Sequence, residues 1–433
     1  MDFPLDTNRA RRAALLGSIA IAGILAVQAA QIWLANHRIQ SRDSNTIERG
    51  VQLTPGNADG WDRLGRFRQW DLMDPDISAA IADYQNAVRR EPSSPYYWMD
   101  LASAYEDAGD IASARDAFRR AKDVYPASAD VAWHYGNFLL RQQESAEGMK
   151  EIQRAVRTDG SLLPQAVSRV WHSSHDVNAL LDQVLPPNNI ESYFAALDFF
   201  DSLHEAEPAL VIWQKLLAFE KPFLLTRSFP FIEELIREDR SEDARRVWLG
   251  ALGAAGLPHE VPADQSVVWD GSFTQAFPNG GLGWRWEPPP GVAIDFDRQR
   301  QWNGTRSVRL DFGGGTNLEL NEPLQYVPVE PNRTYSFRAY LRTERISTES
   351  GLRFSITDPH HPADVSVLTD NLTGTNSWTE ANAQVSTGPQ THFLLVRLYR
   401  SPSRLFENKL SGTAWIADVS LVPSNAQGKG STR

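Results

Sequence analysis

Trp98-Met-Asp-Leu101-Ala102-Ser-Ala-Tyr105 opens the most regular segment of the chain. Its apolar and small residues are spaced i, i+3, i+4 and i+7, which places them on one face of a helix. Gly109-Asp110 breaks that helix, and the stretch Ala112-Ser-Ala-Arg-Asp-Ala-Phe118-Arg-Arg-Ala121 repeats the spacing in a second one. Tyr125-Pro126 closes the segment, because proline cannot continue a helix. The segment therefore predicts two helices that approach closely through small residues.

The same pattern occurs before and after this segment. One copy begins at Trp61 and ends at Pro92, and another begins at Trp133. Pro92 and Pro126 are 34 residues apart, which is one full period. The copies resemble tetratricopeptide repeats at their Trp, Leu-Gly or Leu-Ala, Tyr, Ala, Phe and Pro positions. This resemblance implies a solenoid of stacked helical pairs whose groove binds a protein or peptide partner.

Helical character continues beyond Asp159, although the period becomes irregular. Amphipathic stretches cover residues 163–185, 190–205, 209–219 and 229–252. Ser241-Glu-Asp-Ala-Arg-Arg-Val-Trp248 again has the pattern of the second helix of a repeat. We therefore predict one all-α, tetratricopeptide-like solenoid over residues 45–256, with irregular later repeats.

An apolar stretch precedes the repeats. Residues 13–35 contain no charged side chain and have the length that a membrane-spanning helix needs. Because Arg9, Arg11 and Arg12 precede this stretch, the positive-inside bias places residues 1–12 in the cytoplasm. The sequence thus predicts a single-pass anchor in the inner (cytoplasmic) membrane, with the bulk of the chain on the periplasmic or extracellular side. The alternative is a cleaved secretory signal, since Ala29 and Ala30 supply small residues after the apolar run.

Composition narrows the classes of function. The chain of 433 residues has no cysteine, which excludes disulfides, thiol nucleophiles and thiolate metal sites. Its formal net charge is −11 and its pI is about 5.4, which argues against a nucleic-acid partner, because such proteins cluster Lys and Arg against phosphates.

Beyond a turn-rich linker at residues 257–265 the periodicity changes from helix to strand. Runs that alternate apolar and polar residues cover residues 307–312, 334–341, 352–356, 393–399 and 413–421. Several such strands without intervening helices predict an all-β antiparallel sandwich or jelly roll over residues 266–423. We expect residues 424–433 to form a disordered tail.

This region also resembles a known family. Val267-Val-Trp-Asp270-Gly-Ser-Phe273, Gly283-Trp284, Asn303-Gly304 and Trp415-Ile-Ala-Asp418-Val-Ser-Leu421 follow an order similar to that of carbohydrate-binding modules of families 4 and 9 and their galactose-binding-like relatives. The resemblance implies that Asp270 and Asp418 frame a structural calcium, whose six to eight oxygen ligands would include backbone carbonyls. The family usually has two consecutive acids in the last strand, whereas this chain has Ala417-Asp418, so one ligand is missing. The resemblance also places Trp284, Trp378 and Trp415 in the core.

Polysaccharide binding needs flat aromatic faces and hydrogen-bonding side chains in a concave site. The predicted carbohydrate contacts are Trp286, Trp302 and Tyr326, with Arg342 as a polar neighbour. Trp302 lies in Arg300-Gln-Trp-Asn-Gly304, which predicts an exposed loop before a strand. The alternative for Trp302 is that it folds back over the edge of the sandwich.

The sequence contains no catalytic signature, and we expect no enzyme. His360 and His361 lie in a proline-flanked loop with Asp358, but adjacent residues in an extended segment point to opposite sides, which predicts a solvated turn rather than a metal site. His172 and His175 lack the glutamate of the zinc-protease helix.

Together these features predict a membrane-anchored envelope adaptor. Its repeats would bind a protein partner and its sandwich a polysaccharide, in the assembly or export of surface polysaccharide. The alternative is a pure protein scaffold whose sandwich binds no sugar, and a glycan-active enzyme is a third reading.

Overall fold

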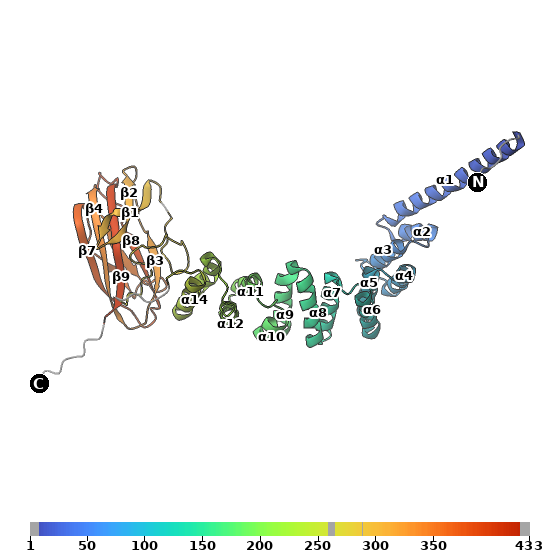
Figure 1. Cartoon of the computed structure of the whole chain (residues 1–433), viewed down its shortest axis with the longest axis horizontal. Helices are drawn as coiled ribbons and strands as arrows, with labels where there is room; N and C mark the ends of the chain where they lie inside the picture. The colour runs from blue at the N-terminus through green and yellow to red at the C-terminus, as the bar shows by residue number, and fades with distance from the viewer. Residues whose placement is uncertain (1–7, 259–264, 288, 425–433) are drawn as a thin grey trace. The chain divides into compact units, whose positions relative to one another are not determined.

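The computed structural model describes residues 8–258, 265–287 and 289–424 (Figure 1). By compactness the chain divides between Pro186 and Pro187 into two units, which are described in turn. The predicted linker at residues 257–265 thus lies within the second unit. Its residues 259–264 are outside the described part of the chain, as are residues 1–7 of the predicted cytoplasmic segment and residues 425–433 of the predicted tail.

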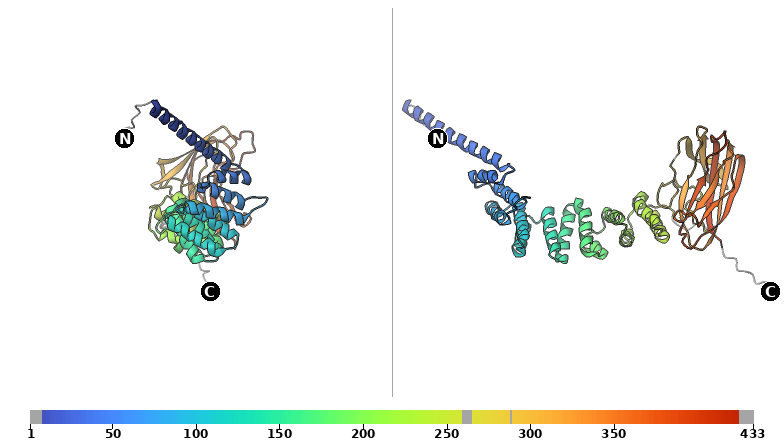
Figure 2. Two further views of the ribbon diagram at one scale, coloured as in Figure 1. Left: turned by 90° about the vertical axis from the view of Figure 1, so that its right-hand side faces the viewer. Right: turned by 180° about the vertical axis from the view of Figure 1, so that it is seen from behind.

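The first unit is helical. Its elements are α1 (Asn8–Ile39), α2 (Ser44–Leu53), α3 (Ala58–Gln69), α4 (Ile77–Arg90), α5 (Pro95–Asp107), α6 (Ile111–Val124), α7 (Ala129–Arg141), α8 (Ser145–Thr158), η1 (Gly160–Leu162), α9 (Leu163–Ser174) and α10 (Val177–Gln183). Asp43, Asn57, Asp76, Asp110 and Ser128 cap the N-termini of α2, α3, α4, α6 and α7 by accepting a hydrogen bond from a backbone N–H of the first turn. Short turns join successive helices into packed pairs, which confirms the predicted helical solenoid of tetratricopeptide type (Figure 2).

Small residues set the distance between the helices of a pair. A Cβ on Gly65 of α3 would lie 2.8 Å from the ring of Tyr84 in α4, and a Cβ on Gly136 of α7 would lie 3.0 Å from the side chain of Ile152 in α8. The repeated tryptophans are structural as well: Nε1 of Trp98 donates to the carbonyl oxygen of Pro92 at 3.0 Å. Trp61 makes the same 3.0 Å bond to Pro55, so each tryptophan ties its helix to the end of the preceding pair.

The apolar stretch forms a helix that continues beyond residue 35. Residues 11–39 of α1 are long and apolar enough to cross a membrane, as a signal sequence near the N-terminus would also be. Ala35 and Ile39 at the end of α1 are buried, and Gly50 of α2 lies against both of them. The last turn of α1 therefore packs as part of the first helical pair.

The second unit begins with helices. These are α11 (Ile190–Ser202), α12 (Ala206–Leu217), η2 (Leu225–Ser228), α13 (Phe229–Arg237) and α14 (Ser241–Ala254). The stretch predicted as helical over residues 229–252 is two helices, because Asp239 adopts a φ of +59° and turns the chain between them. Ser241 thus begins the second helix of a pair, as its sequence pattern indicated.

The strands of the second unit are β1 (Val292–Trp302), β2 (Thr305–Gly313), β3 (Leu324–Pro328), β4 (Thr334–Ile346), β5 (Arg353–Thr357), β6 (Ser366–Leu368), β7 (Gly374–Ser386), β8 (Phe393–Tyr399) and β9 (Ser411–Pro423). They form one sheet in the order β1-β2-β9-β4-β7 and another in the order β3-β8-β5-β6, with every pair antiparallel. Phe337 of β4 and Phe354 of β5 come from different sheets, yet their rings are 5.1 Å apart in one core. The prediction of a β-rich C-terminal region is therefore confirmed.

Replacing Gly65 with valine should destabilise the first repeats. The new side chain would enter the space of the Tyr84 ring, and overpacking of this kind costs about 1–3 kcal/mol. Urea unfolding of the full chain, followed by far-ultraviolet circular dichroism, measures the effect. The matched control is Gly56→Val, since a Cβ on Gly56 would meet nothing within 4 Å. Equal losses in the two variants would contradict the role given to Gly65.

Candidate functional site

Four aromatic side chains lie on the face of the five-stranded sheet that points away from the core. In β4 the side chains of Phe337, Ala339 and Leu341 are buried in the core, so Tyr340 and Arg342 project from the opposite face. Trp302, Trp378 and Trp415 join Tyr340 there, and these four residues are called the outer-face cluster. Trp415, Tyr340 and Trp378 come from the adjacent strands β9, β4 and β7, and Trp302 comes from the end of β1.

Trp302 is the centre of this cluster. Its ring is stacked on that of Tyr340, with centroids 4.0 Å apart and planes 24° apart. The ring of Trp378 lies 6.1 Å away. The register of β1 shifts between Asp297 and Trp302, which allows the end of the strand to cross the sheet face. Trp302 is therefore half-buried against the sheet rather than free in a loop.

Trp415 lies beneath charged side chains. Its Nε1 donates to Asp297 Oδ2 at 2.9 Å, and the guanidinium groups of Arg309 and Arg342 lie 5.9 and 5.8 Å from the centre of its ring. Both arginines sit directly across from Trp415 in the neighbouring strands. The resemblance placed Trp378 and Trp415 in the core, but neither belongs to the core cluster, whereas Trp284 does. Side chains alternate between the two faces along β9. Because Ala414 and Ile416 point into the core, Trp415 between them points outward.

The other two predicted sugar contacts lie elsewhere. Trp286 is only 9% exposed and belongs to the core of the two sheets, so its faces are occupied by protein. Tyr326 in β3 is half-buried on the other sheet, and the Arg285 guanidinium lies 4.8 Å from its ring. The structure thus brings Trp302 and Arg342 onto one face and separates them from Trp286 and Tyr326.

The helices of the second unit pack against the β region at a contact called here the seam. The Trp248 ring of α14 meets the Trp269 ring edge-on, with centroids 5.4 Å apart. A Cβ on Gly281 would lie 2.7 Å from Trp248, so only glycine allows this approach at its φ of +58°. Glu233 Oε1 of α13 accepts hydrogen bonds from the Gly281 N–H at 3.0 Å and from Arg285 at 2.7 Å. Packing and charge therefore hold the helices and sheets together.

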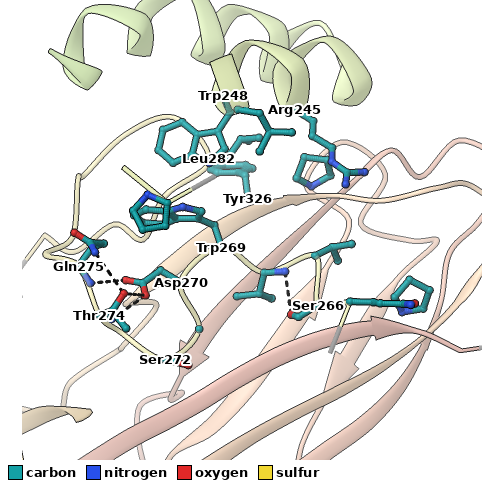
Figure 3. Close-up of a pocket in the computed structure, with 18 of the residues that line it drawn as sticks. Arg245, Trp248, Ser266, Trp269, Asp270, Ser272, Thr274, Gln275, Leu282 and Tyr326 are labelled. Carbon is teal, nitrogen blue, oxygen red and sulfur yellow. Dashed lines mark hydrogen bonds between the residues drawn. The ribbon is translucent and has the colours of Figure 1, made fainter. Parts of the chain in front are cut away.

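A pocket of about 610 Å³ opens at this seam (Figure 3). Its wall from the helices includes Arg245 and Trp248, and its wall from the β region includes Trp269 and Tyr326. Figure 3 shows Asp270 at one end, where its carboxylate accepts hydrogen bonds from the Thr274 and Gln275 segment. The pocket is therefore built from both parts of the unit, and it contains Tyr326 and Asp270 of the predicted site residues.

Histidines of the β region meet a carboxylate of the helices on another side of the seam. His392 Nδ1 lies 2.6 Å from Asp239 Oδ2, and His360 Nδ1 lies 3.3 Å from Asp239 Oδ1. The loop of His360 and His361 was predicted to be a solvated turn, but His360 is partly buried against Asp239. This contact between the His360 ring and Asp239 could not be predicted from the sequence, because the two residues are more than a hundred positions apart.

Asp270, one of the two predicted calcium ligands, accepts hydrogen bonds from its own loop. The Asp270 carboxylate accepts hydrogen bonds from Thr274 N and Oγ1 at 2.7 Å and from Gln275 N at 2.8 Å. Burial raises the pKa of Asp270, while these donors oppose the rise. Within the described residues, no group of three or more His, Cys, Asp or Glu side chains is placed to hold a metal ion. N–H and O–H groups thus take three acceptor positions of the Asp270 carboxylate, and the calcium site stays a prediction.

The repeats of the first unit carry a polar ladder along α3, α5 and α7. Arg66 of α3 donates to Asp100 Oδ2 of α5 at 2.9 and 2.6 Å and lies 3.1 Å from Asp62. Arg141 of α7 donates to Glu106 of α5 at 2.8 and 2.7 Å. These bonds join the first helices of successive pairs into one continuous surface, called the first-helix face.

Asp62 is the unusual member of this face. It is 2% exposed, and burial, followed by the charge of Asp100, raises its pKa to about 8. Its Oδ1 has no hydrogen-bond partner in the part of the chain that the structure describes. Asp62 could not be identified from the sequence, because only the fold shows that its side chain is buried.

Comparisons with known proteins agree with the helical part of the fold. Residues 76–128 and 100–162 match the tetratricopeptide repeat family. The E3 ubiquitin-protein ligase CHIP of Arabidopsis thaliana is 30% identical over 80 residues, which cover 18% of this chain and 29% of that protein. The small glutamine-rich tetratricopeptide repeat-containing protein 2 of Mycosarcoma maydis is 29% identical over 86 residues, covering 20% of this chain and 24% of that protein. The chain thus spans less than a third of these curated relatives, and tetratricopeptide repeats are what it shares with them.

Several solved structures show a weak similarity to part of the chain. MamA matches with a TM-score of 0.26 and 16% identity, over 41% of this chain and 86% of that one. YrrB, described as a tetratricopeptide repeat protein with an unusual peptide-binding site, matches with a TM-score of 0.28 and 14% identity, over 41% and 93%. PilF of Pseudomonas aeruginosa matches with a TM-score of 0.29 and 14% identity, over 53% and 93%. Likeness at this level says nothing about function.

Replacing Trp248 with alanine should loosen the seam. The side chain is buried between α14 and the loop of Gly281 and Gly283, and loss of a buried tryptophan costs about 3–5 kcal/mol. Hydrogen exchange of the full chain should then speed up in α13, α14 and residues 265–287 together. The matched control Trp70→Ala removes a ring that is 64% exposed and should change the stability by about 0.5 kcal/mol or less. Protection unchanged in residues 265–287 would show that the seam does not couple the two parts.

Replacing Asp62 with asparagine should flatten the pH dependence of stability. Because the pKa of Asp62 is about 8 when folded and the ordinary value is 3.8, its contribution to stability is full below about pH 4 and is lost as the pH rises to about 8. The wild type should therefore lose stability relative to Asp62→Asn across that range, as measured by urea unfolding at several pH values. Asp59→Asn, an exposed acid of the same helix, is the control. Parallel curves for wild type and Asp62→Asn would refute the assignment.

Proposed function

We propose that this protein is a membrane-anchored adaptor of the cell envelope. It binds a protein or peptide partner through its helical repeats and a polysaccharide through the outer-face cluster, and it takes part in the assembly or export of surface polysaccharide. In this proposal the two sheets are a jelly roll of the carbohydrate-binding-module type. Residues 13–35 of α1 are the single-pass anchor in the inner membrane, with the rest of the chain on the periplasmic or extracellular side.

The repeats support the protein-binding half of the proposal. Tetratricopeptide repeats mediate contacts between proteins, and stacked repeats present a continuous surface to a partner. The first-helix face is such a surface, since the bonds of Arg66 and Arg141 connect α3, α5 and α7, which are the first helices of three successive pairs. The formal net charge of −11 argues against a nucleic acid as the partner.

The outer-face cluster is the observation that carries the polysaccharide half. Aromatic side chains on a sheet face away from the core have no packing role in that core, and flat rings with polar neighbours are what a pyranose surface needs. Arg309 and Arg342 supply donors beside Trp415, and each retains a carboxylate neighbour, Asp311 at 2.9 Å and Glu344 at 3.2 Å. The proposal needs neither a catalytic residue nor calcium.

One observation favours the alternative of a pure protein scaffold. Trp302 has one face covered by Tyr340, and Trp415 is only 4% exposed beneath its arginines. Rings that already pack on one another leave less area for a sugar and suit a contact with a protein. In this alternative the sheet face binds another envelope protein and the repeats keep their role.

Trp378→Ala should weaken the binding that retards the full chain in affinity gels containing the polysaccharide by about fivefold. Trp378 is half-buried at the edge of the cluster, so the ring can be removed with little loss of core packing, and stacking of this kind contributes on the order of 1 kcal/mol per ring. A panel of envelope polysaccharides in detergent-containing gels gives the measurement.

The matched control is Phe406→Ala, which removes an aromatic ring that is 100% exposed and lies outside the outer-face cluster. Retardation that is unchanged in the control and about fivefold weaker in Trp378→Ala supports the site. If no polysaccharide retards the wild type, the scaffold alternative replaces the proposal. If both variants behave like the wild type, binding occurs elsewhere.

A further inference from the structure

The first repeat contains a pocket of about 570 Å³ that borders the buried carboxyl group of Asp62. The pocket lies between the turn after α1, which contributes Ser41 and Arg42, and the end of α3 with the residues that follow it. Asp62 and Arg66 lie on α3, at the beginning of the first-helix face. The pocket is thus an opening in the same surface to which the repeats would bind a partner.

Asp62 lacks a full set of partners at this position. Arg66 directs two hydrogen bonds to Asp100 and lies 3.1 Å from one oxygen of Asp62. The other oxygen, Oδ1, has no hydrogen-bond partner among the described residues. One guanidinium group therefore serves two carboxyl groups, and a buried charge that is only partly paired is costly.

The raised pKa of Asp62 reflects this lack of hydrogen-bond and ion-pair partners. Burial and the neighbouring charge of Asp100 hold the pKa of Asp62 well above its ordinary range, although Arg66 opposes the rise. The same two carboxyl groups and burial raise the pKa of Tyr84, whose ring lies beneath α3. Near neutral pH the Asp62 carboxyl group thus carries a proton where a second cation would otherwise pair with it.

The wall of the pocket is apolar and unusually exposed. Trp70 is 64% exposed and Leu72 is 99% exposed, although both are large apolar side chains. The inner wall is formed by Ile47 and Phe67. Arg42, Asp59 and Arg63 also line the pocket and are exposed, and Asp71 is half-buried there, so water screens their charges more than that of Asp62.

We propose that this pocket takes a lysine or arginine side chain of a peptide partner, which pairs with Asp62, while apolar neighbours of that side chain pack on Trp70 and Leu72. The inference rests on the proposed binding of a peptide by the repeats and adds the chemistry that the partner must have. Entry of the cation displaces the proton of Asp62 to solvent, so binding at neutral pH releases a proton. The partner segment is basic and partly apolar.

Selection from a random library of 12-residue peptides tests this on the full chain in a mild detergent. The wild type should enrich peptides that contain Lys or Arg beside apolar residues. Asp62→Asn keeps the shape of the side chain but cannot become negatively charged when a cation binds. It should lower the affinity for the enriched peptides by about tenfold or more. Asp62→Asn is expected to fold, because it replaces a buried carboxyl group that is protonated near neutral pH with a neutral amide of the same shape. Asp116→Asn is the matched control, since Asp116 is an exposed acid of α6 that does not line the pocket, and this variant should bind the peptides as well as the wild type. Arg63→Gln is compared with them to detect peptides that depend on an arginine of the pocket instead.

Calorimetry of one enriched peptide at neutral pH adds a second readout. The observed enthalpy should differ between phosphate and Tris buffers for the wild type, because the released proton is taken up by the buffer, and this difference should vanish in Asp62→Asn. Enrichment that is unchanged by Asp62→Asn would overturn the inference and leave peptide binding by the repeats intact. Acidic peptides that depend on Arg63 would overturn it as well. If no peptide is enriched at all, both the inference and the proposed role of the repeats fail.

Discussion

The close approach of paired helices at small residues is the constraint on which the repeats depend. Gly65 leaves just enough space for the ring of Tyr84, and Gly136 does the same for Ile152. This approach fixes the angle and spacing of each pair, and it thereby sets the distance between the first helices of successive pairs. At the resulting distance Arg66 reaches across to Asp100. The first-helix face, with its buried Asp62, is thus a consequence of tight packing, because the same closeness that joins the helices also excludes water from the carboxyl group.

The second unit joins helices and sheets by a different means. Its seam combines an aromatic contact between Trp248 and Trp269 with the Glu233 bonds to Gly281 and Arg285. Helices that resemble the end of a solenoid in sequence are therefore part of the same compact unit as the β region. In the proposed adaptor, the sheets that carry the polysaccharide-binding face would thus be packed against α13 and α14 of the same unit. The peptide-binding face belongs to the first unit, so the two proposed sites are built independently.

The elements that could be predicted from the sequence are those whose pattern is local. The helical pairs at Trp61, Trp98 and Trp133 and the alternating strands β2, β4, β5, β8 and β9 were all foreseen, and family comparison confirms the repeats over residues 76–162. β7 was not predicted, because Ala381 and Ala383 at its inward positions are small. The alternation of apolar and polar residues along it is therefore weak. The outer-face cluster was only partly foreseen: Trp302 and Arg342 were singled out, but the outward direction of Trp415 depends on its pairing with two neighbouring strands. Asp62 and the pairing of Asp239 with His392 depend on burial and on contacts distant in sequence, which no local pattern encodes.

The central claim is that one chain joins a peptide to a polysaccharide, and simultaneous binding tests it most directly. Full-length protein in detergent would be captured on an immobilised envelope polysaccharide, and a labelled peptide selected on the repeats would then be added. The account predicts that the captured protein retains the peptide with the affinity that it has in free solution, because the two faces lie in separate units. Failure of the protein to be captured on any polysaccharide, or release of the protein when the peptide is added, would contradict the adaptor.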